Sequence, residues 1–177
     1  MNFIAMDFET ANQYPESACS LALVMVRNNK IIDRFYTVIN PQMPFDSRHI
    51  KVHDINAQDV QDAPTMAEVW PKIKGLFQPG MLVTAHNARF DTNVMKKSLI
   101  RYNIAEPHYL VIDTLEISKK LEPALPNHKL DTVSSALGIE LWHHHNALSD
   151  SEACAGILIK EEEKNGSDTI KQFVYQI

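Results

Sequence analysis

The sequence predicts an α/β domain in which helices pack against a mixed sheet. The chain has 177 residues, of which 45% are hydrophobic and 22% charged, as is usual for one globular domain. Its first part is typical of strands joined by turns, and the remainder of short strands that alternate with helices. Sequential strands pair antiparallel, whereas strands joined through a helix pair parallel, so the two parts together indicate a mixed sheet.

The first expected strands form a meander. Residues 3–9 begin apolar on both faces, which is typical of a central strand covered on both sides. Residues 20–26 and 31–39 follow as strands, joined by a turn at Asn28–Asn29. The Pro-punctuated segment 40–64 is expected to be mostly loop.

Helices are expected where apolar residues recur at helical spacing. The first begins at a capping box of Thr65 and Glu68 and ends before Pro79–Gly80. Two short strands, 81–85 and 109–112, lie between the later helices. Those helices are expected over 91–102, from the Asp113 cap onward, and over 130–137, 148–164 and 168–175. We expect one domain over residues 1–177, with its core in about 1–164 and a short C-terminal segment in 165–177.

Composition excludes several classes of protein. Two cysteines are too few for a disulfide framework, and no apolar run approaches the roughly 18 residues that cross a bilayer. The first ten residues lack the features of a signal peptide. A formal net charge of −5 argues against a domain that grips a long duplex through basic side chains. We therefore expect a cytoplasmic protein with no membrane partner.

Four acidic residues occupy positions where the pattern calls for buried side chains. Asp7 and Glu9 share one face of the first strand with apolar residues. Asp91 lies on the apolar stripe of its helix, since residues three, four, eight and eleven positions later are apolar or aromatic. Asp150 precedes a similar stripe at four, seven and eight positions. Three separate elements thus direct acids inward.

Buried carboxylates are costly unless they are paired, protonated or bound to metal. No Lys or Arg lies on these stripes to pair with them. Without the four acids the chain would have 17 basic and 18 acidic residues, a net charge of −1 instead of −5. Two divalent cations would balance four carboxylates, and oxygen-only ligands suit Mg²⁺ or Mn²⁺ better than Zn²⁺.

Each acid taken alone has an ordinary explanation, because an Asp near a helix N-terminus is usually a cap. The repetition of one motif argues against that explanation. The pattern HNAxxD occurs at residues 86–91 and again at 145–150, and each time it ends on one of the inward acids.

These motifs resemble those of the DEDDh 3′–5′ exonucleases, a family that includes the proofreading epsilon subunit of bacterial DNA polymerase III. The matching residues are Asp7-Phe8-Glu9-Thr10, then His86-Asn87 with Phe90-Asp91, and His145 with Ala147 and Asp150. The resemblance covers nearly the whole chain and implies an RNase H-like fold with a mixed five-stranded sheet. One departure is Phe8, where many members carry Thr, on the face away from the acids.

The resemblance also implies roles for the residues. Two Mg²⁺ or Mn²⁺ ions would be held by Asp7, Glu9, Asp91 and Asp150, with His145 as the general base. Substrate contacts are expected at Thr10, His53, His86, Asn87 and Phe90. A structural hydrogen-bonding role for His86 and a capping role for His53 stay open. We expect Asp113 to be a helix cap, and His143 and His144 to be solvated loop residues.

The implied activity is release of nucleoside 5′-monophosphates from the 3′ end of single-stranded DNA or RNA. The alternatives are an exoribonuclease, a non-catalytic module bound to a DNA polymerase, and an RNase H-like endonuclease. Only 27 residues follow Asp150, which favours a free-standing enzyme or an excised domain. The sequence does not decide between DNA and RNA, nor between proofreading and RNA processing.

Overall fold

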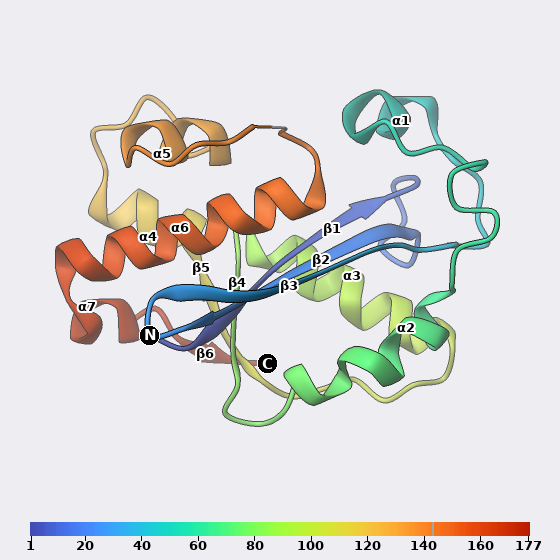
Figure 1. The fold of residues 1–177 in the computed structure, drawn as a ribbon, viewed down its shortest axis with the longest axis horizontal. Helices are drawn as coiled ribbons and strands as arrows, with labels where there is room; N and C mark the ends of the chain where they lie inside the picture. The colour runs from blue at the N-terminus through green and yellow to red at the C-terminus, as the bar shows by residue number, and fades with distance from the viewer. Residues whose placement is uncertain (143) are drawn as a thin grey trace.

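A mixed sheet runs through the molecule in the order β3-β2-β1-β4-β5-β6 (Figure 1). The computed structural model describes residues 1–142 and 144–177. The strands of this described part are β1 (Phe3–Thr10), β2 (Ala18–Arg27), β3 (Lys30–Val38), β4 (Leu82–Ala85), β5 (Leu110–Asp113) and β6 (Tyr175–Gln176). β1, β2 and β3 pair antiparallel, whereas β4 pairs parallel with both β1 and β5. The predicted mixed α/β sheet is confirmed.

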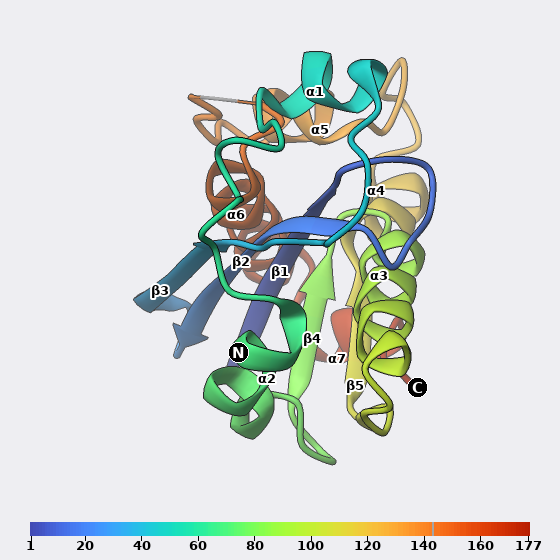
Figure 2. The same cartoon turned by 90° about the vertical axis from the view of Figure 1, so that its right-hand side faces the viewer.

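Helices cover both faces of this sheet. They are α1 (Ser47–His53), α2 (Met66–Ile73) with the 3-10 turn η1 (Lys74–Leu76), α3 (Ala88–Arg101), α4 (Thr114–Leu121), α5 (Leu130–Ala136), α6 (Ala147–Asn165) and α7 (Ser167–Lys171). Figure 2 shows α3 on one side of β1 and α6 on the other. Among the described residues, no helix combines the length and apolar character needed to cross a membrane.

The alternation of β1 divides the core in two. Ile4, Met6 and Phe8 pack with the buried residues of α2 and α3. Phe3 and Ala5 pack on the opposite face with residues of α4, α6 and α7. Asp7 and Glu9 continue the second face, because side chains of a strand alternate. β1 is therefore the central, doubly covered strand that its sequence predicts.

One expectation about secondary structure is wrong, and a second is incomplete. The sheet has six strands in the described residues, not five. The helix expected over 168–175 ends at Lys171, and the chain after it forms β6. β6 pairs with β5 at Leu110–Gln176 and Val111–Tyr175, which supplies partners for backbone groups at the edge of β5. A two-residue strand is too short to show alternation in the sequence.

The incomplete expectation concerns residues 40–64, which are mostly loop as expected but also contain α1. Asp46 is its N-cap and accepts the Arg48 backbone N–H at 2.8 Å. Asp54 ends it with a left-handed φ of 60°. The Thr65–Glu68 capping box is confirmed, because the Glu68 carboxylate accepts the Thr65 backbone N–H at 2.8 Å.

Candidate functional site

The four acids meet beside the C-terminal end of β1, although they come from β1, α3 and α6. Ligating oxygens of Asp7, Glu9 and Asp150 lie within 4.8 Å of one another. Asp91 approaches from the other face of the sheet, where its Oδ1 accepts the backbone N–H of Phe8 at 3.0 Å. The predicted convergence of these residues is thus present in the structure.

The end of β4 explains why Asp91 reaches the backbone of β1. β4 pairs with β1 only at Ile4 and Ala5, and the chain then leaves the sheet and enters α3. The Phe8 N–H consequently has no partner from β4, and a buried N–H requires an acceptor. The Asp91 carboxylate supplies that acceptor and is thereby fixed against the strand that carries Asp7 and Glu9.

Asp113 holds the start of α3 in place. Its carboxylate accepts the backbone N–H groups of Asn87 at 3.0 Å and Ala88 at 2.9 Å, as well as that of Leu115 at 2.9 Å. The expected cap of α4 is therefore present, but Asp113 also joins α4 to α3. It acts on the site by positioning the turn that leads to Asp91.

Asp150 is held at the start of α6. Asn146 caps this helix by accepting the Ser149 N–H at 3.2 Å. The Asp150 carboxylate accepts the backbone N–H of His145 through Oδ2 at 3.0 Å, and its Oδ1 lies 3.2 Å from His144 Nδ1. His145 has a left-handed φ of 65°. The HNAxxD spacing thus places His145 beside the acid that ends the motif.

His144 is an exposed loop residue, as we expected, but it also contacts the site. Its ring stacks on that of His145 with centroids 3.8 Å apart, and its Nδ1 approaches Asp150. The sequence did not predict this contact with a buried carboxylate. His143, for which we made the same prediction, lies outside the described residues.

Burial and mutual repulsion make the ionised site unstable without a counter-charge. Burial raises the pKa of Glu9 to about 8, and the charges of Asp150 and Asp91 add to the effect. Burial, followed by the charges of Asp91, Glu9 and Asp150, raises the pKa of Asp7 well above its ordinary value. Burial likewise raises the pKa of Asp91 and of Asp150. Within the described residues, none of the four makes an ion pair with Lys or Arg, and Asp150 contacts the imidazole of His144.

The donor set fits divalent cations. Four carboxylates offer only oxygen atoms, which are the ligands that Mg²⁺ and Mn²⁺ prefer. Cations would lower the raised carboxyl pKa values, because a nearby positive charge favours the ionised form. Bound cations would therefore explain why four acids share a protected site. No Lys or Arg among the described residues neutralises them.

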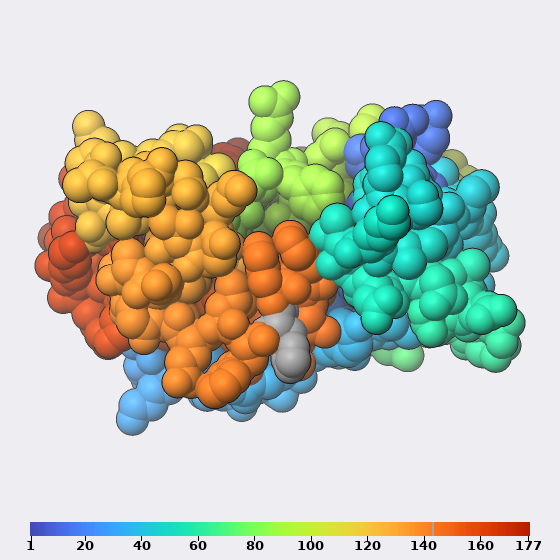
Figure 3. Space-filling view, turned by 90° about the horizontal axis from the view of Figure 1, so that it is seen from above, coloured from blue at the N-terminus to red at the C-terminus, as the bar shows by residue number. Residues whose placement is uncertain are grey.

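A cavity of about 390 Å³ opens beside Glu9. It is lined from β1, the following loop, α1 and α3 by Glu9, Thr10, Gln13, Arg48, His49, Val52, His53 and Phe90. Val52 and Phe90 are 49% and 43% exposed, and both line this one cavity. Figure 3 views this end of the molecule, where α1 (teal) lies close to the segment before α6 (orange). The cavity thus offers apolar surfaces immediately next to the acids.

The predicted substrate contacts divide into two groups. Thr10, His53 and Phe90 line the cavity. The two others, His86 and Asn87, are not among its described lining residues. His86 Nε2 donates to the His128 carbonyl at 2.8 Å, and its Nδ1 lies 3.0 Å from Thr114 Oγ1. These contacts within the fold favour the structural alternative for His86.

His53 combines burial with a defined tautomer. Its Nδ1 accepts the Ile55 N–H at 3.1 Å, so Nε2 carries the proton and donates to the Thr10 carbonyl at 3.1 Å. Burial is the main cause that lowers the pKa of His53. The imidazole therefore fixes the backbone of Thr10 directly after Glu9, in addition to lining the cavity.

Of the residues that α1 contributes to the cavity, sequence reasoning found only His53. Arg48, His49 and Val52 were not predicted, because their segment was expected to be mostly loop. The signal that could have found them is Asp46, whose N-cap position two residues before Arg48 indicates a helix start.

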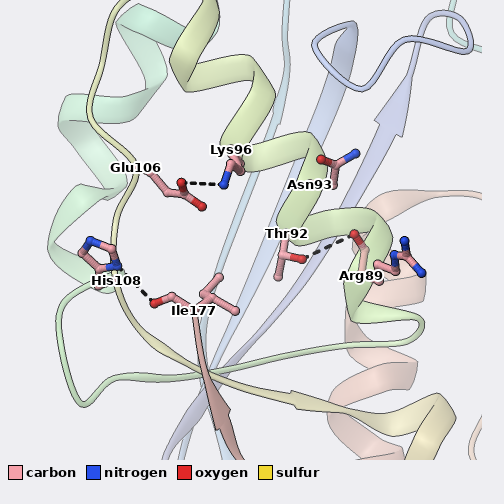
Figure 4. Close-up of a pocket in the computed structure, with 7 residues that line it drawn as sticks. All are labelled: Arg89, Thr92, Asn93, Lys96, Glu106, His108 and Ile177. Carbon is pink, nitrogen blue, oxygen red and sulfur yellow. Dashed lines mark hydrogen bonds and ion pairs between the residues drawn. The ribbon is translucent and has the colours of Figure 1, made fainter.

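A larger cavity, of about 590 Å³, lies along the outer side of α3 (Figure 4). Its lining includes the Lys96–Glu106 ion pair at 2.8 Å, and His108, whose Nδ1 contacts the Ile177 carbonyl at 3.2 Å. None of the four acids lines it in the described residues. The chemistry that the acids support therefore belongs to the smaller cavity beside Glu9.

Comparison with known proteins identifies the same segment. Residues 4–158 match the family model described as Exonuclease. The chain is 37% identical over 164 residues to the DNA polymerase III PolC-type of Caldanaerobacter subterraneus, and 36% identical over 163 residues to that of Bacillus subtilis. These matches cover 92% and 89% of this chain but only 12% and 11% of the relatives, so the chain spans about an eighth of their length.

Solved structures share the fold. Exonuclease X in complex with 5′ overhanging duplex DNA has a TM-score of 0.79 and 23% identity, and the match covers 97% of this chain and 96% of that chain. Escherichia coli exonuclease I in complex with a dA16 oligonucleotide has a TM-score of 0.80 and 18% identity, over 93% and 41% of the two chains. The predicted RNase H-like fold is confirmed.

Proposed function

This chain belongs to the Exonuclease family, and from this premise we propose that it is a metal-dependent 3′–5′ exonuclease. The motif resemblance is thereby confirmed for the family, and the chain is an exonuclease domain. We propose further that residues 1–177 form one domain. It would release nucleoside 5′-monophosphates from single-stranded 3′ ends by hydrolysis of the terminal phosphodiester.

The observation that carries this proposal is the convergence of four carboxylates whose pKa values are all raised. A fold under selection for stability alone gains nothing from such a site, because each ionised acid destabilises the others. Perturbed carboxylates beside a cavity are typical of catalytic sites. The arrangement is therefore best explained by a reaction that needs cations at this position.

We propose that Asp7, Glu9, Asp91 and Asp150 hold two Mg²⁺ or Mn²⁺ ions. When bound, such ions polarise the phosphodiester and activate water for attack. Of the four, Asp91 is fixed by the Phe8 N–H and Asp150 by the His145 N–H. Both helix-borne carboxylates are thus oriented before any ligand arrives.

His145 is the proposed general base. A base must be neutral before it accepts the proton of the attacking water, and burial together with the neighbouring His144 lowers the pKa of His145. Its backbone N–H is bound by Asp150, and its side chain is only partly covered. The imidazole can therefore turn toward water at the acids without disturbing α6.

The cavity beside Glu9 is the proposed site of the 3′-terminal nucleoside. Phe90 and Val52 offer exposed apolar surfaces for a nucleobase. Any of the nucleobases can stack on an aromatic side chain such as Phe90. His53 holds the Thr10 backbone, which is the proposed contact for the sugar. His86 and Asn87 are not among the described lining residues of this cavity, so we propose that they act by positioning Asp91.

DNA is the favoured substrate. The curated relatives are DNA polymerases by name, and the exonuclease X and exonuclease I structures compared above are complexes with DNA. A DNA polymerase is accordingly a proposed partner. The exoribonuclease remains the second candidate, since the cavity contacts do not distinguish the two sugars. A non-catalytic module would be expected to lack one of the five catalytic positions, and all five are present.

Oligonucleotides labelled at the 5′ end test the proposal. Stepwise shortening with Mg²⁺ or Mn²⁺, and none with EDTA, is the expected result. Matched DNA and RNA strands of one sequence determine the sugar preference. Internal cuts would instead indicate an endonuclease, and no cleavage in any metal would indicate the binding module.

A further inference from the structure

Two imidazoles and one carboxylate form a group of mixed donors at the edge of the acidic cluster. One ligating atom from each of His144, His145 and Asp150 lies within 4.8 Å of the other two. The two rings are nearly parallel, with planes 22° apart. His144 and His145 both belong to the short segment before α6, so one backbone segment delivers both nitrogens to the carboxylate.

The spacing of these donors suits a small tetrahedral ion. Zn²⁺ binds imidazole nitrogen and carboxylate oxygen at about 2.0–2.1 Å, which places neighbouring donors of a tetrahedron about 3.3 Å apart. His144 Nδ1 and Asp150 Oδ1 are 3.2 Å apart. His144 would bind in the tautomer that carries its proton on Nε2, and the stacked His145 ring would have to turn to direct a nitrogen at the same ion.

The chemistry of the donors distinguishes this group from the four carboxylates. Oxygen-only sites favour Mg²⁺ and Mn²⁺, whereas imidazole nitrogen favours Zn²⁺ and related transition-metal ions. Asp131, in the first turn of α5, is close enough to act electrostatically on both rings. A cation here would therefore face a second negative charge.

We propose that His144, His145 and Asp150 form an inhibitory site for Zn²⁺ or a similar transition-metal ion. Asp150 belongs to both donor groups, and His145 is the proposed general base. An ion at the mixed site therefore withdraws one carboxylate and the base from hydrolysis. The inhibition rests on the proposed exonuclease function, whereas the binding of the ion does not.

Binding is measured first, and without reference to activity. Calorimetric titration of Zn²⁺ into Asp7→Asn protein, with excess Mg²⁺ present, is expected to show one Zn²⁺ per chain. Adding His144→Ala is expected to weaken this binding about tenfold or more, because even residues that only orient a metal ligand contribute about 10–100-fold to affinity. Co²⁺ is the spectroscopic probe, and its tetrahedral visible absorption is expected to disappear with His144→Ala. His108→Ala is the matched control, because His108 lies in the separate cavity along α3.

Inhibition is measured next on the otherwise unmodified chain. Zn²⁺ is titrated at saturating Mg²⁺, and each variant is compared with its own rate without Zn²⁺. His144→Ala is expected to need about tenfold more Zn²⁺ for half inhibition, and His108→Ala to behave like the unmodified chain. Equal Zn²⁺ affinity with and without His144, or Zn²⁺ binding without inhibition, would overturn the proposal. Zn²⁺ bound through His144 in a chain that never cleaves with Mg²⁺ would support the ion site and refute the exonuclease.

Discussion

Asp7 experiences the repulsion of all three of its acidic neighbours. After burial, the charges of Asp91, Glu9 and Asp150 are the causes that raise its pKa. Removing this one charge should therefore stabilise the metal-free protein, because it reduces the repulsion among the acids. The same change should disable the proposed cation site. Function and stability oppose each other at this residue.

We expect Asp7→Asn to slow Mg²⁺-dependent cleavage by at least about 10²-fold, since metal ions contribute several kcal/mol to such reactions. The metal-free variant should gain on the order of 1 kcal/mol at pH 8, or about 2–4 °C in Tm at this chain length. Single-turnover cleavage and thermal unfolding measure the two effects. Asp168→Asn is the control, because Asp168 is fully exposed. A near-normal cleavage rate in Asp7→Asn would refute the site.

His145→Ala tests the proposed base separately from the metal ligands. We expect the chemical step to slow by about 10²–10⁴-fold, as general bases typically contribute. Mn²⁺ binding should persist, because the side chain is exposed and all four carboxylates remain. Rapid-quench measurements give the rate, and calorimetry gives the binding. An unchanged single-turnover rate would exclude the role.

At the scale of elements, Asp113 links the start of α3 to the start of α4. Its carboxylate accepts three backbone N–H groups, and buried donors that lose their acceptor destabilise the fold by about 1–3 kcal/mol each. The same bonds determine where Asp91 lies relative to β1. The stability of the fold and the position of Asp91 in the proposed metal site therefore both depend on this side chain.

We expect Asp113→Ala to lower the free energy of unfolding by about 2–4 kcal/mol and to weaken Mn²⁺ binding through displacement of Asp91. Urea unfolding and Mn²⁺ titration measure these effects. Asp46→Ala is the comparison, because it removes the N-cap of α1. It should lower the free energy of unfolding by about 1 kcal/mol. A loss no larger than that of Asp46→Ala would contradict the proposed link.

The acids could be predicted from sequence because periodicity alone shows which way a side chain points. Alternation in β1 placed Asp7 and Glu9 on one face, and the apolar stripes of two helices turned Asp91 and Asp150 inward. Such patterns are local and extend over whole elements. The same logic gave the order of strands and helices, and therefore the mixed sheet.

The contacts that complete the site could not be predicted in this way. Asp113 meets Asn87 and Ala88 only because β4 and β5 pair at Ala85 and Asp113, so the link depends on tertiary structure. The position of His144 depends on the loop beside it, where the backbone of His145 is left-handed. No periodicity exists in a loop, and short elements such as α1 and β6 carry too few residues to show one.

At the scale of the whole molecule, the pKa shifts predict an unusual dependence of stability on pH. Glu9 has an ordinary pKa of 4.5 and a folded pKa of about 8, so its contribution to stability is complete below 4.5 and is lost as the pH rises toward 8. His53 and His86 have lowered pKa values because of burial. Their contribution is complete above about 6.5 and is lost at lower pH.

The metal-free chain should therefore lose stability between pH 6.5 and 8.5, where the histidines no longer contribute to the change. Mg²⁺ should reverse the loss, because cations stabilise the ionised carboxylates. Chemical unfolding at several pH values, with EDTA or Mg²⁺, measures both effects. Glu9→Gln should reduce the slope of the EDTA curve, and the other three raised carboxyl groups should account for the slope that is left. An EDTA curve that rises over this range, or equals the Mg²⁺ curve, would contradict the electrostatic account.

Anomalous diffraction from crystals soaked in Mn²⁺ tests the central claim most directly. We predict two manganese peaks about 3.5–4 Å apart, in contact with Asp7, Glu9, Asp91 and Asp150, and their loss in Asp7→Asn. Manganese bound away from these carboxylates, or none bound at concentrations that support cleavage, would contradict it.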